Sequence, residues 1–415
     1  MSRETCLHLF DGFGVELEYM ICDRKTLSVL PVADSLLRDA SGRCESEIEK
    51  GDLRWSNEFV LHVIELKTNG PVSSWDGLAG TFQRHIHTIN AALEPLGGVL
   101  LPTAMHPWMD PDRETRLWPH EYNIIYETYH RIFNCRGHGW SNLQSTHLNL
   151  PFADEEEFAR LHAGIRLLLP ILPAVTASSP IVELKATGWL DNRMVFYRNN
   201  SLRIPSITGS VIPEPIFSTE TYKKDILQKM YADIASYDPE GILQHEWLNA
   251  RGAIARFERN TIEIRVLDAQ ECPQAEIAVL WAIVAALEAL AEERCASLEQ
   301  QQAWQVTPLE AIFSATIKEA DAAVISDSKY LRMFGLNSNT PCTAGDLWRH
   351  IFEKLIPTSG GGIQPLAQTF RVILQHGPLA RRLLKRLHGR FSRASISSVY
   401  EELITCLNEG KLFLG

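Results

Sequence analysis

Glu16 and Glu18 lie two residues apart in a segment where apolar residues alternate with other types. This alternation predicts a β-strand over 12–21 with one apolar face, because successive side chains of a strand point to opposite sides. Both carboxylates then project from the other face, about 7 Å apart. Close carboxylates repel each other unless they share a proton or a cation lies between them. The pair therefore suits a magnesium site or, as the plainer interpretation, a solvated outer face.

A hairpin predicted over residues 253–267 carries the second group. Glu263 and Arg265 share the face of its second strand that lies opposite the apolar face. A guanidinium suits bidentate binding of a phosphate or a carboxylate. The alternative is a cross-strand ladder of salt bridges with Arg256 and Glu258.

Two further predicted strands each add one candidate ligand. His147 lies on the polar face of 143–150, and Glu65 lies in the mainly apolar segment 59–68. A neutral imidazole can bind a metal, although a single histidine is often only hydrogen-bonded. A carboxylate among apolar residues needs a partner or a metal, and Lys67 is the alternative partner for Glu65.

The four strands share a design in which one face is apolar and the other carries reactive groups. Oxygen ligands with one imidazole suit Mg²⁺ or Mn²⁺ better than Zn²⁺. Other motifs are absent from the sequence: there is no Walker A run, no H-E-x-x-H and no G-x-S-x-G. The G-x-G at 12–14 precedes a predicted strand and not a helix, which excludes a dinucleotide-binding motif.

The remaining elements are mostly helical, which gives an α+β fold. Helices are predicted over 75–96, 154–169, 222–237 and 274–296, and over 308–325, 345–355, 365–375, 379–390 and 398–408. Ser398 and Glu401 form a candidate capping box for the last helix. We expect a catalytic domain over 1–296 and a helical C-terminal region over 297–415. Segment 201–219 and the glycine-rich segment 357–362 are predicted loops.

Composition limits the possible partners and location. The 415 residues carry a net charge of −11, which argues against nucleic-acid binding but not against ATP. The eight cysteines contain no C-x-x-C pair, residues 1–5 do not begin an apolar signal segment, and the apolar stretch 277–287 is too short to cross a bilayer. We therefore expect a cytoplasmic protein without membrane contact. A basic amphipathic stretch, 381–393, is predicted to present a solvated face, with a partner or anion contact as the alternative.

Several segments, in order along residues 10–270, resemble motifs of the glutamate–cysteine ligase type 2 family of carboxylate–amine ligases. They are Gly14-Val15-Glu16-Leu17-Glu18, Glu65-Leu66-Lys67-Thr68, His106-Pro107-Trp108, Thr146-His147-Leu148-Asn149-Leu150, Ala177-Ser178-Ser179-Pro180 followed by Arg193, and Thr261-Ile262-Glu263-Ile264-Arg265-Val266-Leu267-Asp268. The family belongs to the glutamine synthetase-like superfamily.

The resemblance implies a curved antiparallel sheet that holds magnesium ions between ATP and an amino-acid or peptide carboxylate. It also implies an amine as the second substrate. The metal ligands it implies are Glu16, Glu18, Glu65, His147 and Glu263, and the catalytic candidates are Arg265 and Glu65. Arg193, Arg198 and Arg203 are candidates for binding ATP phosphate or a substrate carboxylate. We further expect a homo-oligomer.

The chain departs from the family pattern at two places and has no recognised match after about residue 300. Asn149 replaces the family's second histidine, and 197–205 fits the family's R-W-P region poorly. Two other functions therefore stay open: a guanidino kinase on the same sheet, and a binding protein that has kept the fold without catalysis.

Overall fold

The computed structural model describes residues 6–337, 340–358, 360 and 362–415. Its centre is an eight-stranded antiparallel sheet in the order β2-β3-β4-β1-β6-β10-β9, in which β5 also pairs with β1. The predicted strands correspond to β1 (Gly14–Asp23), β4 (Val63–Thr68), β6 (Ser145–Pro151), β9 (Ala253–Arg256) and β10 (Thr261–Asp268). Three strands were not predicted: β2 (Glu47–Lys50), β3 (Leu53–Asn57) and β5 (Gly98–Leu101). The predicted α+β class is confirmed.

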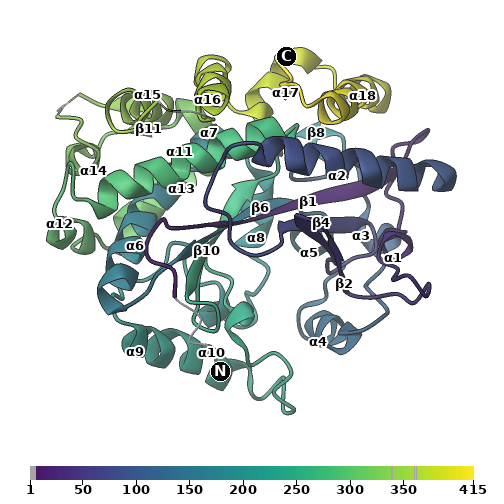
Figure 1. Ribbon diagram of the computed structural model, residues 1–415, viewed down its shortest axis with the longest axis horizontal. Coiled ribbons are helices and arrows are strands. Elements are labelled where there is room, and N and C mark those ends of the chain that lie inside the picture. Colours follow the sequence, from purple (N-terminus) through teal and green to yellow (C-terminus); the bar gives the residue numbers. More distant parts are fainter. Residues whose placement is uncertain (1–5, 338–339, 359, 361) are drawn as a thin grey trace.

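Helices α2 (Leu78–Leu93), α6 (Glu155–Leu168) and α11 (Pro273–Ala291) pack together against the sheet. In Figure 1, α2 and α11 lie above the sheet, whereas α4 (Asn123–Phe133), α9 (Thr219–Tyr222) and α10 (Lys229–Ile234) lie below it. The apolar face of the strands, which includes Val15 and Leu17, is fully buried in the main core. The opposite face is therefore left for polar side chains.

Local sequence explains two of these helices. Asp154 begins α6 by accepting a hydrogen bond from the Glu157 backbone N–H, at the position where the helix over 154–169 was predicted to start. Helix α11 is longer than the apolar stretch suggested, and its length and composition would suffice to cross a membrane. However, 83% of that segment is buried inside the protein, where it forms the core helix behind the sheet.

The helix predicted over 222–237 has a different form. Helix α9 runs through a π-helical turn, Lys223–Gln228, into α10, which ends at Ile234. The shorter elements are α1 (Ala33–Leu36), α3 (Pro111–Glu114), α5 (His138–Ser141), α7 (Pro173–Thr176), α8 (Asn192–Tyr197), β7 (Ile181–Val182), β8 (Lys185–Ala186), β11 (Val324–Ile325) and β12 (Cys342–Thr343).

The C-terminal region is helical, as predicted. Its helices are α12 (Leu298–Gln302), α13 (Val306–Glu319), α14 (Ser328–Met333), α15 (Ala344–Lys354), α16 (Gln364–His376), α17 (Leu379–Leu387) and α18 (Arg393–Glu409). The predicted capping box is wrong, because α18 begins earlier and the Ser392 hydroxyl caps it by accepting from the Ser395 N–H. Of the predicted N-terminal segment and the loop 357–362, residues 1–5, 359 and 361 lie outside the described residues.

These C-terminal helices pack directly on the rest of the chain. Helix α16 contacts α11, and α18 contacts both α2 and β5 (Figure 1). The main hydrophobic core contains residues from both sides of position 296. The prediction of a solvated basic face on α17 is wrong for Arg382, which is 1% exposed and forms an ion pair with buried Glu271.

Candidate active site

Strand register brings the predicted acidic residues together on the polar face of the sheet. Glu18 of β1 lies opposite Glu65 of β4, and Glu16 lies opposite His147 of β6. On the far side of β6, Glu263 of β10 lies within 4.0 Å of the His147 Nδ1 atom. All five predicted metal ligands therefore lie in one continuous patch.

Two overlapping groups in this patch could each hold a metal ion. Glu16, Glu65 and His147 form one group, and Glu18, Glu58 and Glu65 form the other, with ligand atoms within 4.8 Å of one another in each. Glu65 belongs to both groups. Glu58 was not predicted, because it lies in the turn after the unpredicted strand β3. Its only signal in the sequence is a carboxylate directly before the predicted strand 59–68.

Neighbouring polar groups fix the carboxylates of Glu65 on β4 and Glu18 on β1. The Ser56 hydroxyl donates to Glu65 at 2.5 Å, and the Ser145 backbone N–H donates to Glu18 at 2.7 Å. Lys67, the predicted alternative partner, lies 3.4 Å from Glu65. Each carboxylate still has lone pairs available, since a carboxylate can accept about four hydrogen bonds.

Glu16 is held from the neighbouring strand β6. Its two oxygens contact His147 Nδ1 at 3.1 Å and the Asn149 amide N–H at 3.0 Å. Asn149, which replaces the family's histidine, is thus a hydrogen-bond donor to a candidate ligand. Its own Oδ1 atom is buried without a partner among the described residues. Gly14 lies opposite Asn149, and a Cβ there would come within 3.2 Å of the Asn149 Cβ.

Charge crowding perturbs the titration of this patch. Burial and the neighbouring Glu16 carboxylate raise the pKa of Glu65 to about 7. Burial and the Glu18 and Glu65 carboxylates raise the pKa of Glu58 well above its usual range. Burial opposes ionisation of Glu16 as well, but its contacts with His147 prevail and lower its pKa. Burial also works against a charged His147, yet its hydrogen bond to the Glu16 carboxylate and the nearby carboxylates raise its pKa.

The patch has the chemistry of a site for hard divalent cations. It gathers several carboxylates and one imidazole, and it pushes protons onto Glu58 and Glu65 when no cation neutralises them. Oxygen-rich ligand sets of this kind suit Mg²⁺ or Mn²⁺. The orphan Asn149 oxygen is one more acceptor beside Glu16.

Arg265 adds positive charge at the edge of the acidic patch. Its Nε atom lies 2.9 Å from Glu263 Oε1, and Arg256 donates to the other oxygen of Glu263 at 2.9 Å. The Arg265 side chain keeps 25% of its surface exposed, whereas Glu263 keeps 4%. Arg256 and Glu263 thus form part of the predicted ladder. Arg265 remains partly accessible, and its binding of a phosphate or a carboxylate stays a prediction.

The three other predicted arginines lie elsewhere. Arg193 is 2% exposed and pairs with Asp268, so its side chain is not free to bind a phosphate. Arg198 lies over the ring of Trp189, and exposed Arg203 lies over the ring of Tyr237. No ion pair joins either of them to the acidic patch within the described part of the chain.

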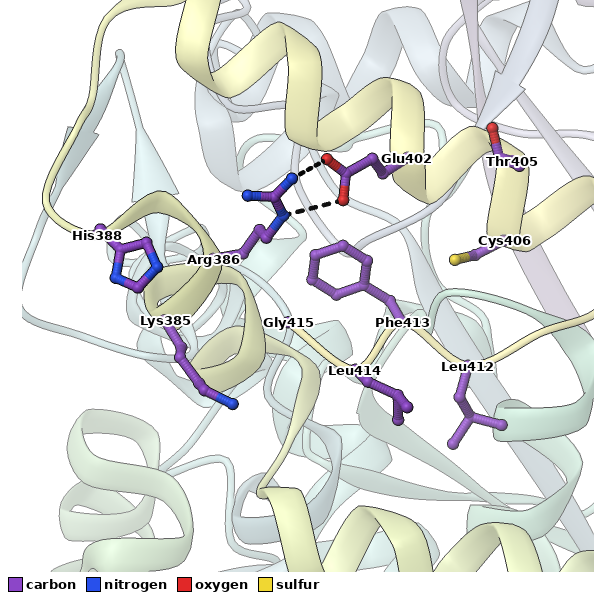
Figure 2. A pocket seen from close by; sticks show the side chains of 10 residues that line it. All are labelled: Lys385, Arg386, His388, Glu402, Thr405, Cys406, Leu412, Phe413, Leu414 and Gly415. Carbon is purple, nitrogen blue, oxygen red and sulfur yellow. Dashed lines mark hydrogen bonds and ion pairs between the residues drawn. The ribbon is translucent and has the colours of Figure 1, made fainter.

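The structure also contains a cavity of about 670 Å³ in the C-terminal region. Figure 2 shows its wall of side chains from α17, α18 and the last residues, including Lys385, His388 and Phe413. The Arg386 guanidinium there makes two hydrogen bonds to Glu402. None of the acidic-patch residues lines this cavity, so it is separate from the candidate active site.

Comparison with known proteins identifies the family. The model of glutamate–cysteine ligase family 2 matches residues 12–327. An uncharacterized protein of Archaeoglobus fulgidus is 31% identical over 401 residues, covering 97% of this chain and all of that protein. A protein of Nocardioides sp. provisionally named glutamate–cysteine ligase 2-1 is 24% identical over 284 residues, covering 68% of each chain.

Solved structures share the fold at low sequence identity. The glutamate–cysteine ligase of Francisella tularensis, crystallised with AMP, has a TM-score of 0.60 and 12% identity, covering 97% of this chain and 90% of its own. The bifunctional glutathione synthetase of Pasteurella multocida has a TM-score of 0.52 and 14% identity, covering 95% of this chain and 52% of its own. The antiparallel sheet, the ordered motifs and the family match agree: the chain belongs to glutamate–cysteine ligase family 2, a family of carboxylate–amine ligases.

Proposed function

We propose that this protein is an ATP-dependent ligase that joins a carboxylate to an amine through an acyl phosphate. A carboxylate oxygen of the first substrate attacks the γ-phosphorus of ATP, and ADP leaves. The amine of the second substrate then attacks the acyl carbon, phosphate leaves, and the nitrogen gives up a proton. The product is an amide.

The observation that carries this proposal is the acidic patch with its two overlapping carboxylate groups. Such a surface repels an anionic nucleotide unless divalent cations intervene, and family membership supplies the ligase class. Glu16, Glu18, Glu58, Glu65, His147 and Glu263 would hold the cations. When bound, Mg²⁺ would neutralise phosphate charge and orient the nucleotide. The AMP found in the Francisella tularensis ligase supports a nucleotide as ligand.

Arg265 would stabilise charge during phosphoryl transfer. Phosphoryl transfer needs positioning and charge neutralisation more than covalent help from the protein. A partly exposed guanidinium at the edge of the patch would stabilise negative charge on the transferred group. An ion pair with Glu263, 2.9 Å long, holds this guanidinium at the edge of the patch.

Glutamate and cysteine are the first substrates to test. We expect purified protein with Mg-ATP to release ADP only when both a carboxylate and an amine substrate are present. A screen of amino acids and amines that follows ADP release, with mass spectrometry of the product, would identify the pair. ADP release with a guanidino compound and no amide product would instead indicate a kinase.

The metal assignment has its own test. Glu16→Ala and Glu263→Ala should each reduce ATP turnover on the order of 1000-fold, because each removes a proposed cation ligand. Circular dichroism should show that both variants fold. Arg160→Ala, on the surface of α6, is the matched control and should turn over ATP as the wild type does. Wild-type ADP release from both glutamate variants would show that the assignment is wrong.

A further inference from the structure

Arg193 lies in a buried network behind Arg265. Its Nε donates to Asp268 Oδ1 at 2.6 Å, and the two side chains are 2% and 0% exposed. The other oxygen of Asp268 accepts from the Ser178 backbone N–H at 2.8 Å and the Ser179 hydroxyl at 2.9 Å. Because both oxygens of Asp268 are occupied, the pair holds the Arg193 guanidinium in one orientation.

The strand that carries Arg265 contains a β-bulge at this residue. Ile264 pairs with Leu148 and Leu267 pairs with Thr146, so two residues of β10 lie opposite a single residue of β6. Arg265 is the first of these two. A bulge of this kind removes backbone groups from the ladder and redirects the side chain at that position.

Arg193 supplies hydrogen bonds at the bulge. Its Nη1 and Nη2 atoms each donate to the Arg265 carbonyl oxygen at 3.3 Å. The Arg265 N–H donates to the Gly252 carbonyl at 2.9 Å. Both backbone polar groups of Arg265 are thus hydrogen-bonded, while its side chain extends to Glu263 and to the Asn249 carbonyl.

We propose that Arg193 and Asp268 are positioning residues that fix the bulge of β10 and thereby aim the Arg265 guanidinium at the transferred phosphoryl group. This inference rests on the proposed function of Arg265. Arg193 would act by hydrogen bonding to the Arg265 backbone carbonyl, and not by contacting a phosphate as the sequence predicted. A bidentate guanidinium is required, because the ammonium group of a lysine cannot reproduce its fixed fork of donors.

A second buried pair provides a matched control. Arg382 is 1% exposed and Glu271 is 0% exposed, so this pair is as deeply buried as the first. Arg382 donates to the Gly377 and Phe413 carbonyls in the C-terminal region and has no contact with Arg265 among the described residues. A lysine at either position disturbs a buried ion pair, but only one of the two pairs touches the bulge.

The experiment compares Arg193→Lys with Arg382→Lys. Hydrogen–deuterium exchange of the peptide 261–268 should rise in Arg193→Lys and stay at the wild-type level in Arg382→Lys. The kcat of Arg193→Lys should fall on the order of 10- to 100-fold, with KM for ATP nearly unchanged. Substitutions of residues that orient a reactive group typically have effects of this size. Asp268→Asn, which keeps the side-chain shape, should behave in the same way if Arg193→Lys fails to fold.

A double variant decides whether Arg193 acts through Arg265. Adding Arg193→Lys to Arg265→Ala should cause no further loss of kcat, because the positioned group is already gone. Losses that multiply, or unchanged exchange of 261–268 in both Arg193→Lys and Asp268→Asn, would overturn the inference. If the wild type turns over no substrate pair, the proposed function fails, whereas the exchange measurement still decides the role of Arg193.

Discussion

The acidic patch on the sheet and the C-terminal helices both gather charged side chains, but they balance charge differently. In the C-terminal region, Arg381, Arg382 and Arg386 each pair with one carboxylate. In the patch, by contrast, carboxylates outnumber the cationic side chains. Among the described residues, the ion pairs of Glu16, Glu18, Glu65 and Glu263 are with Lys67, Arg256, Arg265 and His147, and Glu58 adds a fifth carboxylate.

This difference indicates a structural role for the paired charges and a binding role for the acidic patch. Balanced pairs satisfy each other and need no further partner. A buried excess of negative charge is costly unless protons or cations neutralise it, so the acidic patch favours the binding of cations. The cavity between α17, α18 and the last residues is therefore a weaker candidate for catalysis than the acidic patch.

The largest effect should come from Arg265, the accessible cation of the patch. Arg265→Ala should reduce kcat for ADP release by about 10³- to 10⁵-fold, the range for an arginine that stabilises a transferring phosphoryl group. Thermal unfolding should change far less than kcat, because Arg256 still pairs with buried Glu263 after the substitution. Steady-state kinetics and a melting curve check both parts. Unchanged kcat would assign the guanidinium a purely structural role.

Phe413→Ala in the C-terminal region should lower stability and leave kcat unchanged. The ring is 4% exposed and belongs to an apolar cluster that includes Leu403 of α18 and Met20 of β1. Removing it should destabilise the protein by about 3–5 kcal/mol, the usual cost of a Phe→Ala cavity. We expect kcat of the remaining folded protein to match the wild type. Urea unfolding gives the stability, and a lowered kcat at full folding would show that the two regions are coupled.

Glu65→Gln tests how repulsion between the carboxylates lowers the stability of the metal-free protein as the pH rises. The folded state keeps a proton on Glu65 up to about pH 7, whereas the unfolded chain loses it near pH 4.5. Raising the pH between these values therefore lowers stability, by about 3 kcal/mol for this group. The stability of the variant should fall less steeply with rising pH than that of the wild type. The remaining decline is the contribution of His147, whose pKa is also raised in the folded state.

Magnesium should reverse this trend. At pH 8 we expect added Mg²⁺ to raise the melting temperature of the wild type and to have less effect on Glu65→Gln, because binding to the folded state stabilises it by mass action. Buffer with EDTA and no added Mg²⁺ gives the melting temperature of the metal-free protein. An identical Mg²⁺ response in the two proteins would remove Glu65 from the ligand set.

The smallest effect should come from Arg386→Ala beside the C-terminal cavity. Its pair with Glu402 is about 40% exposed on each side, and solvent screens such pairs strongly. Neither the melting temperature nor kcat should change measurably. A clear loss of activity would make the cavity in Figure 2 part of the working enzyme.

Much of the site could be predicted because strand alternation is a local property. The faces of Glu16, Glu18, Glu65, His147 and Glu263 depend only on residues within a few positions along the chain. Their common patch also agrees with the predicted antiparallel sheet. Strand β3 was missed, and with it the turn that carries Glu58.

Helix ends show the same limit. The start of the helix predicted at residue 154 agrees with α6, whose first turn holds three glutamates that favour the helix dipole. Ser398 was chosen wrongly because several serines near 392–398 could each cap a helix, and packing of α18 against α2 and β5 selects the earlier start.

Short motifs and their order along the chain suffice to predict the acidic face of the sheet and the family. The pairing of the charges depends instead on how the chain folds. Arg193 looked like a phosphate contact, yet it meets Asp268, 75 positions away along the chain, under a bulge that no local pattern reveals. Pairing of buried charge depends on which distant segments meet, because desolvation makes an unpaired partner costly wherever the fold places it.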